Sequence, residues 1–239
     1  MKKVVIFGCL SIIVVVIGVS IFIGYKVSSA IAGTGKPRDL GIQITAAQAD
    51  EAQRKTGVQV MALDSSTPLT NSMQFEGSKP VSFSMDSKEL TGLALVRTKY
   101  KYFPFHSVQI RVNDDNSVEV SGLANTAAAI TYATALGYAP GDIEKVINDY
   151  NIPRSNVSFY VKGAGSVINS KVSLDIHDGQ IAGIPVPMGI VNSKKADIIN
   201  LLEDGMRKTP GFEAKSMTFS GGKVHFDGSL AETERIVQQ

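Results

Sequence analysis

An uninterrupted apolar run close to the amino terminus constrains this chain more than any other feature of its sequence. Residues 4–25 (VVIFGCLSIIVVVIGVSIFIGY) contain no charged side chain. As a helix this run would extend over roughly 33 Å, and the hydrocarbon core of a bilayer is about 30 Å thick. We therefore expect residues 4–25 to form one transmembrane helix that anchors the remainder of the chain.

A cleaved signal peptide is the main alternative for this segment. The apolar region of a signal peptide is typically about 7–15 residues long, which is shorter than this run. In addition, Lys26 separates the run from the cleavage-like triplet at 30–32. An uncleaved signal-anchor is therefore favoured. Cys9, the only cysteine, lies inside the run, so the rest of the chain can form neither a disulfide nor a thiolate metal site.

The charges on either side of the run indicate its orientation by a narrow margin. Lys2 and Lys3 precede the run, whereas residues 26–38 carry three cations after it. Because the two lysines lie directly against the run, as in an export signal, we expect residues 1–3 to be cytoplasmic. The domain would then be extracytoplasmic, and the opposite orientation remains open.

The rest of the chain has the composition of one soluble domain behind a tether. Residues 26–40 are mostly small and polar and include Gly and Pro, which indicates a short linker. Residues 41–239 are numerous enough to bury a core. Without Lys2 and Lys3, 22 of the 24 basic residues remain, against 22 acidic ones. Such a neutral domain has no electrostatic reason to bind nucleic acid.

Hydrophobic periodicity predicts an α+β domain, with an antiparallel sheet packed around helices. The expected helices are 45–55, 86–96, 124–136, 142–150 and 193–208. The expected strands are 58–63, 106–112, 118–120, 157–161, 172–176, 217–219 and 224–226. The helix at 124–136 is apolar over most of its circumference, so we expect the sheet to wrap around it.

Several connections can also be predicted from turn-forming residues. Residues 64–78 are expected to be a polar turn region, and turns are expected at residues 163–166 and at Asp178 and Gly179. Residues 83–124 and 190–231 share the order helix, linker, hairpin. A duplicated helix-hairpin unit is one interpretation of that similarity, and chance is the other.

The sequence carries no motif for catalysis, nucleotide binding or metal binding. His106, His177 and His225 lack the spacing of metal ligands, and His177 and His225 should point to solvent by strand alternation. Residues 114–116 lack the spaced ligands and terminal Glu of a calcium loop. We therefore expect no catalytic residue, no metal and no cofactor.

An aromatic segment before the strand at 106–112 is one candidate contact site. Tyr100, Tyr102 and Phe103 lie beside two lysines, and amphipathic aromatics next to cations suit a membrane interface. The alternative, which we favour, is that Phe103 and Phe105 enter the core as the strand begins.

A second candidate is an apolar segment with two prolines, which remove two backbone donors from any strand ladder. It could contact an apolar ligand or a partner through Ile184, Pro185, Val186, Pro187 and Met188. The alternative is a sheet edge that prolines protect against aggregation.

Beyond these local patterns, the chain resembles small bacterial envelope proteins of the YpmS and LmeA type. The similarity lies in the apolar run and in the segments at 83–93 (FSMDSKELTGL), 172–188 (VSLDIHDGQIAGIPVPM) and 221–231 (GGKVHFDGSLA). The resemblance implies a single-pass or exported protein, with a lipid-binding-like fold in which a curved antiparallel sheet wraps long helices. It implies no site residues.

Together these observations predict a bacterial cell-envelope protein whose tethered domain is not an enzyme and binds a lipid, another apolar ligand or another envelope protein. The alternative is a structural or interaction module of a membrane complex, with a filled core and an exposed apolar patch in place of a cavity. An enzyme would require polar groups from distant segments, such as two histidines and acidic residues, to converge in a deep pocket.

Overall fold

The computed structural model describes residues 35–141, 144 and 155–239. This part of the chain forms an α+β domain, as predicted, with four α-helices and two sheets. The apolar run at 4–25 lies outside the described residues, and so does the predicted helix at 142–150 apart from Glu144. Among the helices that are described, none is both long enough and apolar enough to cross a bilayer.

The elements alternate between helices and strands in the first half of the chain and are mostly strands in the second. The helices are α2 (Ala46–Thr56), the 3-10 turn η1 (Leu69–Asn71), α3 (Ser87–Arg97), α4 (Thr126–Ala135) and α6 (Met188–Lys208). The strands are β1 (Gln59–Leu63), β2 (Met73–Glu76), β3 (Lys79–Asp86), β4 (Phe105–Val112), β5 (Val118–Asn125), β6 (Asn156–Ile168), β7 (Lys171–Ile181), β8 (Ile184–Pro185), β9 (Glu213–Ser220), β10 (Lys223–Leu230) and β11 (Thr233–Val237).

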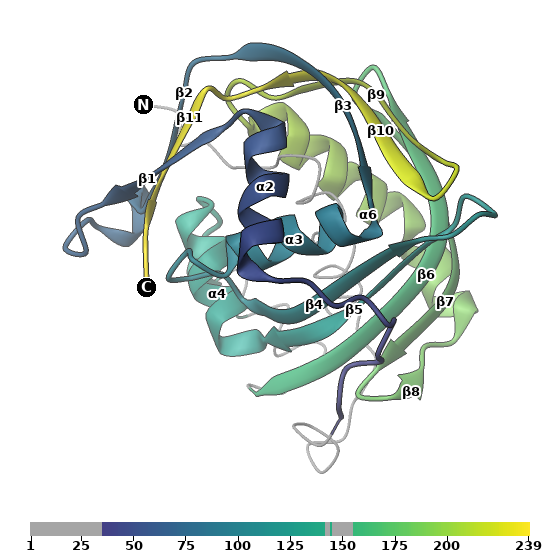
Figure 1. Ribbon diagram of the computed structural model, residues 1–239. Coiled ribbons are helices and arrows are strands. Elements are labelled where there is room, and N and C mark those ends of the chain that lie inside the picture. The colour runs from purple at the N-terminus through teal and green to yellow at the C-terminus, as the bar shows by residue number, and fades with distance from the viewer. Residues whose placement is uncertain (1–34, 142–143, 145–154) are drawn as a thin grey trace.

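The larger sheet has eight strands and curves around the helices (Figure 1). Its order is β3-β10-β9-β6-β5-β4, and all its pairs are antiparallel. β7 pairs with the other edge of β6, and β8 pairs with β7. β5 and β9 share one edge of β6, since β5 pairs with residues 156–163 and β9 with Val167 and Ile168. The sheet therefore branches at β6.

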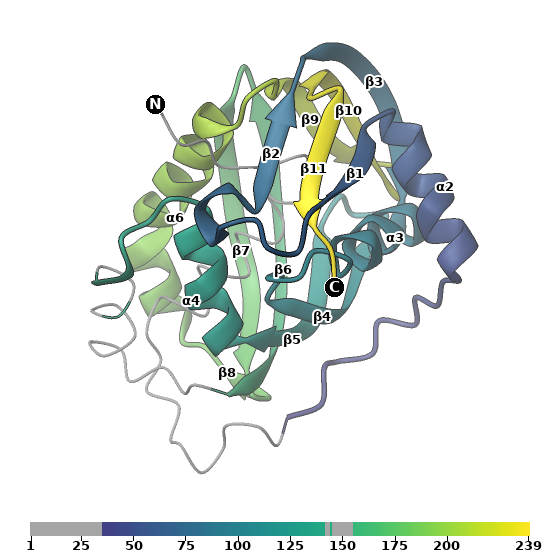
Figure 2. The ribbon, with the colours of Figure 1, turned by 90° about the vertical axis from the view of Figure 1, so that its left-hand side faces the viewer.

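The smaller sheet is mixed and was not expected from the sequence. β11 lies between β1 and β2, parallel to β1 and antiparallel to β2 (Figure 2). The prediction of a turn region at 64–78 is therefore wrong for residues 73–76, which form β2. β2 and β11 are short and have too little alternation to stand out, and pairing with distant segments defines them.

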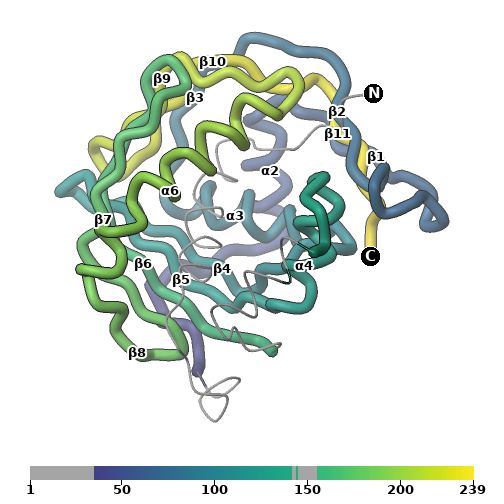
Figure 3. The backbone as a smooth tube through the Cα atoms, turned by 180° about the vertical axis from the view of Figure 1, so that it is seen from behind, coloured from purple at the N-terminus to yellow at the C-terminus, as the bar shows by residue number. Residues whose placement is uncertain are grey.

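The helix that the sheet wraps is α3, and the prediction that this place belongs to residues 124–136 is wrong. Six residues of α3 are buried, Leu90, Thr91, Gly92, Leu93, Ala94 and Val96. In α4 only Thr126 is buried. Figure 2 shows α3 between α2 on one side of the molecule and α4 and α6 on the other, and Figure 3, seen from behind, shows α3 between α6 and α4. Gly92 permits the close approach of α2, since a Cβ there would lie 3.0 Å from Cα of Ala49.

α3 also occupies the place of a further strand beside β4. The Thr91 hydroxyl accepts a hydrogen bond from the Ile110 N–H (2.9 Å) and donates one to the Ile110 carbonyl (3.3 Å). One turn earlier in the helix, Ser87 Oγ accepts from the Val112 N–H at 3.0 Å. Side chains of the helix thus satisfy edge groups of β4 that would otherwise be buried without partners.

Local signals in the sequence placed both ends of α2 and the start of α3 correctly, but not the start of α6. Thr45 and Gln48 form the predicted capping box of α2, and Asp86 and Glu89 form that of α3. Gly57 ends α2 in the left-handed conformation, with φ of 71°. α6 begins at Met188, five residues before the predicted start at 193, directly after Pro187.

Both turns expected between residues 163 and 179 are wrong. Residues 163–166 lie within β6, and Asp178 and Gly179 lie within β7. The chain instead turns at Asn169 and Ser170, whose φ values of 49° and 59° are those of a two-residue type I′ turn. The glycine at 163 serves a close strand approach, because a Cβ there would lie 2.6 Å from the Asp175 carbonyl oxygen.

The two segments compared as a duplication are both a helix followed by a hairpin, α3-β4-β5 and α6-β9-β10. Each hairpin pairs with the same edge of β6, but the first does so through its second strand and the second through its first strand. The two units therefore occupy different places in the sheet.

Candidate functional site

An apolar cavity of about 80 Å³ lies where the sheet branches. Within the described residues, no strand pairs with residues 164–166 on the edge of β6 that β5 and β9 share. The cavity is lined by these residues and by side chains from β5, β7, β9 and α6. Ser166 and Ser173 are the polar residues of its lining, and the others are apolar. We call it the β6 cavity.

The β6 cavity has a buried floor and a partly exposed rim. Leu202 of α6 and Met217 of β9 are almost fully buried and form part of the floor. Val118, Val172 and Phe219 are half-buried and lie at the rim. An apolar group could therefore enter from the surface and replace water on apolar walls, which is favourable.

A second cavity, of about 50 Å³, contains a buried ion pair. Its lining includes Phe75, Phe83 and Phe212, together with Arg97 and Glu234. Arg97 donates to Oε1 of Glu234, whose side chain is 1% exposed. Oε2 of the same carboxylate has no hydrogen-bond partner among the described residues.

The opposite face of the sheet carries a buried polar cluster. Val118 and Val120 face the β6 cavity, so Glu119 between them faces away from it. Glu119 Oε1 accepts from Nη2 of Arg111 (2.7 Å) and Nδ2 of Asn113 (3.0 Å), and Oε2 accepts from the Tyr160 hydroxyl (2.7 Å).

The pKa values in this cluster are shifted in opposite directions. Burial works to raise the pKa of Glu119, but hydrogen bonds from Arg111, Tyr160 and Asn113 outweigh it, so this pKa is lowered. Burial, followed by the hydrogen bond to Glu119, raises the pKa of Tyr160 to about 12. Both groups are thus held in their usual charge states at neutral pH, which indicates a structural role.

Residues 35–40, the last six of the predicted linker, form neither helix nor strand and dock on this polar face. The Arg38 guanidinium lies 4.2 Å from the centroid of the Tyr160 ring. Leu40 is buried, and its N–H donates to Oε1 of Gln109 at 2.6 Å. Nη1 of Arg111 donates to the Leu40 carbonyl at 3.4 Å.

The predicted aromatic site is mostly inside the core. Tyr100 and Phe103 are 2% and 5% exposed, and each ring centroid lies 6.0 Å from that of Tyr132. Tyr102 is half-buried, with the Lys101 ammonium 5.6 Å from its ring centroid. Burial favours the core interpretation for Phe103 and Phe105, each 5% exposed, and Tyr100 is buried as well. Tyr102 is then the partly exposed aromatic of the predicted membrane-interface site.

The predicted apolar segment lies apart from the residues that line the β6 cavity. Ile184 and Pro185 form β8, and Val186 donates its N–H to the Gly179 carbonyl at 2.7 Å. Pro185 and Pro187 are exposed, whereas Ile184, Val186 and Met188 are half-buried.

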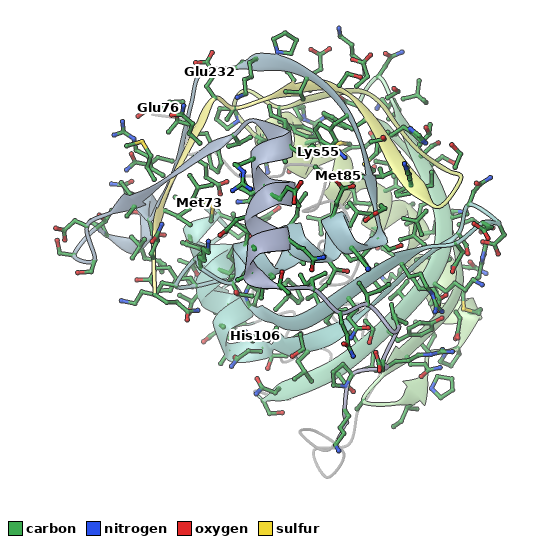
Figure 4. All side chains as sticks on the ribbon, viewed as in Figure 1. Lys55, Met73, Glu76, Met85, His106 and Glu232 are labelled. Carbon is green, nitrogen blue, oxygen red and sulfur yellow. The ribbon has the colours of Figure 1, made fainter. Side chains whose placement is uncertain are left out.

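The histidines stand far apart in the sheet pairing. His106, labelled in Figure 4, comes from β4, His177 from β7 and His225 from β10. His177 and His225 are exposed, as alternation predicted. No cluster of three or more His, Cys, Asp or Glu side chains suited to a metal occurs among residues 35–141, 144 and 155–239.

Sequence reasoning missed the β6 cavity because its walls come from several elements between residues 118 and 219. One signal was available in the sequence. Glycines 163 and 165 lie inside a strand and have no side chain to fill the space beside it, where the β6 cavity lies. Comparisons of the chain with protein-family models, with curated proteins and with solved structures found no match.

Proposed function

We propose that this protein is a non-enzymatic, membrane-anchored envelope protein whose extracytoplasmic domain binds the apolar chain of a lipid, or another apolar ligand, in the β6 cavity. The observation that carries the proposal is the coincidence of an interrupted strand ladder with an almost wholly apolar cavity. Pockets for drug-sized ligands measure about 300–1,000 Å³. A cavity of about 80 Å³ therefore suits the end of one hydrocarbon chain.

The anchor part of the proposal comes from the sequence. Residues 4–25 have the length and composition of a membrane span, and Lys2 and Lys3 favour a cytoplasmic amino terminus. A domain held at a bilayer meets lipids at high local concentration, because tethering makes their encounter effectively intramolecular.

The second candidate is an interaction module of a membrane complex. It is favoured by the small volume of the β6 cavity and by the exposed prolines at 185 and 187. Such a module would bury residues 184–188 against a partner protein and leave the β6 cavity without a ligand.

Tryptophan fluorescence tests the ligand proposal, because the chain contains no Trp. The rim reporter, Phe219→Trp, places the only indole at the rim of the β6 cavity, and the control reporter, Phe75→Trp, places it at the second cavity. A bromine-labelled fatty acid added to the full chain in micelles should quench the rim reporter and leave the control reporter unaffected. Adding Val118→Phe, which narrows the β6 cavity, should weaken this quenching, whereas Val60→Phe on β1 should not.

Three results would contradict ligand binding in the β6 cavity. Equal quenching of the two reporters would indicate non-specific contact with the fatty acid. Quenching of the control reporter alone would place the ligand in the second cavity. The absence of quenching from both would favour the interaction module.

A further inference from the structure

Gly35 lies at the end of the domain where β6 starts and β7 ends. Gly35 packs against Ser158 at the start of β6 and against Ala182 in the β7–β8 turn. A Cβ at Gly35 would overlap Ser158 Oγ and would lie 3.2 Å from Cα of Ala182. From there residues 36–40 run along the polar face toward α2 (Figure 1). The buried Leu40 fixes the other end of this segment.

The same end of the domain presents an apolar, uncharged surface. Residues 181–193 contain no charged side chain. Pro185 and Pro187 are exposed, and half-buried apolar side chains surround them, namely Ala182, Ile184, Val186, Met188 and Ile190. A contiguous exposed apolar surface marks a contact with a protein or a membrane. We call residues 182–190 the β8 surface.

The short stretch of chain between the apolar run and Gly35 favours the membrane over a protein as the partner of the β8 surface. From Tyr25, at the end of the apolar run, to Gly35 there are nine intervening residues, 26–34. Even a fully extended chain of this length spans at most about 35 Å. By comparison, the far end of β6, at Ile168, is roughly 33 Å further along the strand than Ser158.

We propose that the β8 surface rests on the bilayer that holds the anchor. Residues 35–40, which we call the docked segment, would then fix the orientation of the domain. This inference rests on the proposed anchor at 4–25. Pro185, Val186, Pro187 and Met188 would lie at the boundary of headgroups and acyl chains. Lys36, which is exposed beside Gly35, would meet anionic headgroups.

The test uses the full chain in vesicles of phosphatidylethanolamine and phosphatidylglycerol that contain brominated lipid. In a Cys9→Ser background, a fluorophore is attached either to Gly189→Cys on the β8 surface (label 189) or to Ile168→Cys at the far end of β6 (label 168). A side chain at Gly189 meets no atom within 4 Å, and Ile168 is 47% exposed. We expect lipid bromine to quench label 189 at least about fivefold more strongly, because amphipathic surfaces bury only about 5–10 Å into the interface.

Release of the docked segment provides the second comparison. Leu40→Asn places an amide at a buried position and should free the segment, so the quenching of label 189 should fall toward that of label 168. If circular dichroism shows that this variant is unfolded, Gln109→Ala, which removes only the acceptor of the Leu40 N–H, replaces it. If a folded variant whose residues 35–40 are released kept the full difference in quenching between label 189 and label 168, docking would not fix the orientation.

Flotation of the vesicles separates the two proposals. Protein that floats with equal quenching of both labels, or with stronger quenching of label 168, would overturn the orientation and leave the anchor and the β6 cavity untouched. Protein that fails to float would refute the anchor, and the orientation would fall with it. Ligand binding in the β6 cavity is judged separately, by the fluorescence of the rim reporter.

Discussion

Glu119 shows at the scale of a single residue how this domain stabilises a buried charge. Its carboxylate is 5% exposed and receives hydrogen bonds from Arg111, Asn113 and Tyr160. Because Glu119 is the buried charge, removing the groups that donate to it would leave this carboxylate without compensation, which is destabilising. The cluster also supports the docked segment, because Arg111 contacts Leu40 and Tyr160 contacts Arg38.

Glu119→Gln should therefore lower the free energy of unfolding by about 1.5–3 kcal/mol at neutral pH, the range for hydrogen bonds to charged groups. Because the pKa of Glu119 is lowered on folding, its stabilisation is present above the unfolded pKa and is lost as pH falls through the folded one. Urea denaturation at pH 7 and in acid should show the difference disappearing in acid. Glu213→Gln, at an exposed position of β9, is the control.

At the scale of the element, a helix completes the edge of a sheet. Thr91 satisfies both backbone groups of Ile110, and Ser87 satisfies the N–H of Val112. The edge of β4 is thus closed to further strands, which protects it against aggregation.

Thr91→Val keeps the shape of this contact and removes its hydroxyl. Two buried backbone groups of Ile110 lose their partner, so the free energy of unfolding should fall by about 1–3 kcal/mol. Thr98→Val removes a hydroxyl bonded to the Leu95 carbonyl at the exposed end of α3 and should cost no more than about 0.5 kcal/mol. Equal losses in the two variants, measured by denaturation, would show that the contact with β4 contributes nothing specific.

The close approach of β6 and β7 depends on glycine at position 163. Gly163→Ala would place a Cβ 2.6 Å from the Asp175 carbonyl oxygen and force β6 and β7 apart. We expect a loss of about 1–3 kcal/mol in thermal denaturation, typical of overpacking. Gly189→Ala, in open space on α6, should change stability by no more than about 0.5 kcal/mol. A neutral Gly163→Ala would show that β7 can move without cost.

The ends of α2, the start of α3 and the hairpins β4–β5 and β9–β10 could be predicted from the sequence because their signals are local. The capping boxes at Thr45 and Asp86 need only residues three positions apart. The central position of α3 could not be predicted, because Gly92 and Thr91 are poor helix formers whose value lies in contacts with α2 and β4. Glycines often mark turns, and this rule led to the expected turn at 163–166. In the structure, glycines 163 and 165 lie within β6 and allow the backbone of β7 to approach closely.

For the whole molecule, the candidate site is a consequence of topology. The β6 cavity exists because β5 leaves β6 before β9 joins it, and neither strand shows this on its own. The apolar segment at 184–188 could be found in the sequence because it is continuous. Its position beside Gly35 could not, since only the fold brings the β7–β8 turn next to the start of the docked segment.

The place of β11 between β1 and β2 affects how the domain folds. Gln59 pairs with Thr233, about 170 residues further along the chain. Contacts of such high sequence separation form slowly, because loop closure costs entropy before the contact is made. Until β11 arrives, β1 and β2 present unpaired edges to neighbouring chains. We therefore expect the pairing of β11 with β1 and β2 to be among the late steps of folding, and these edges to be open to aggregation until it is complete.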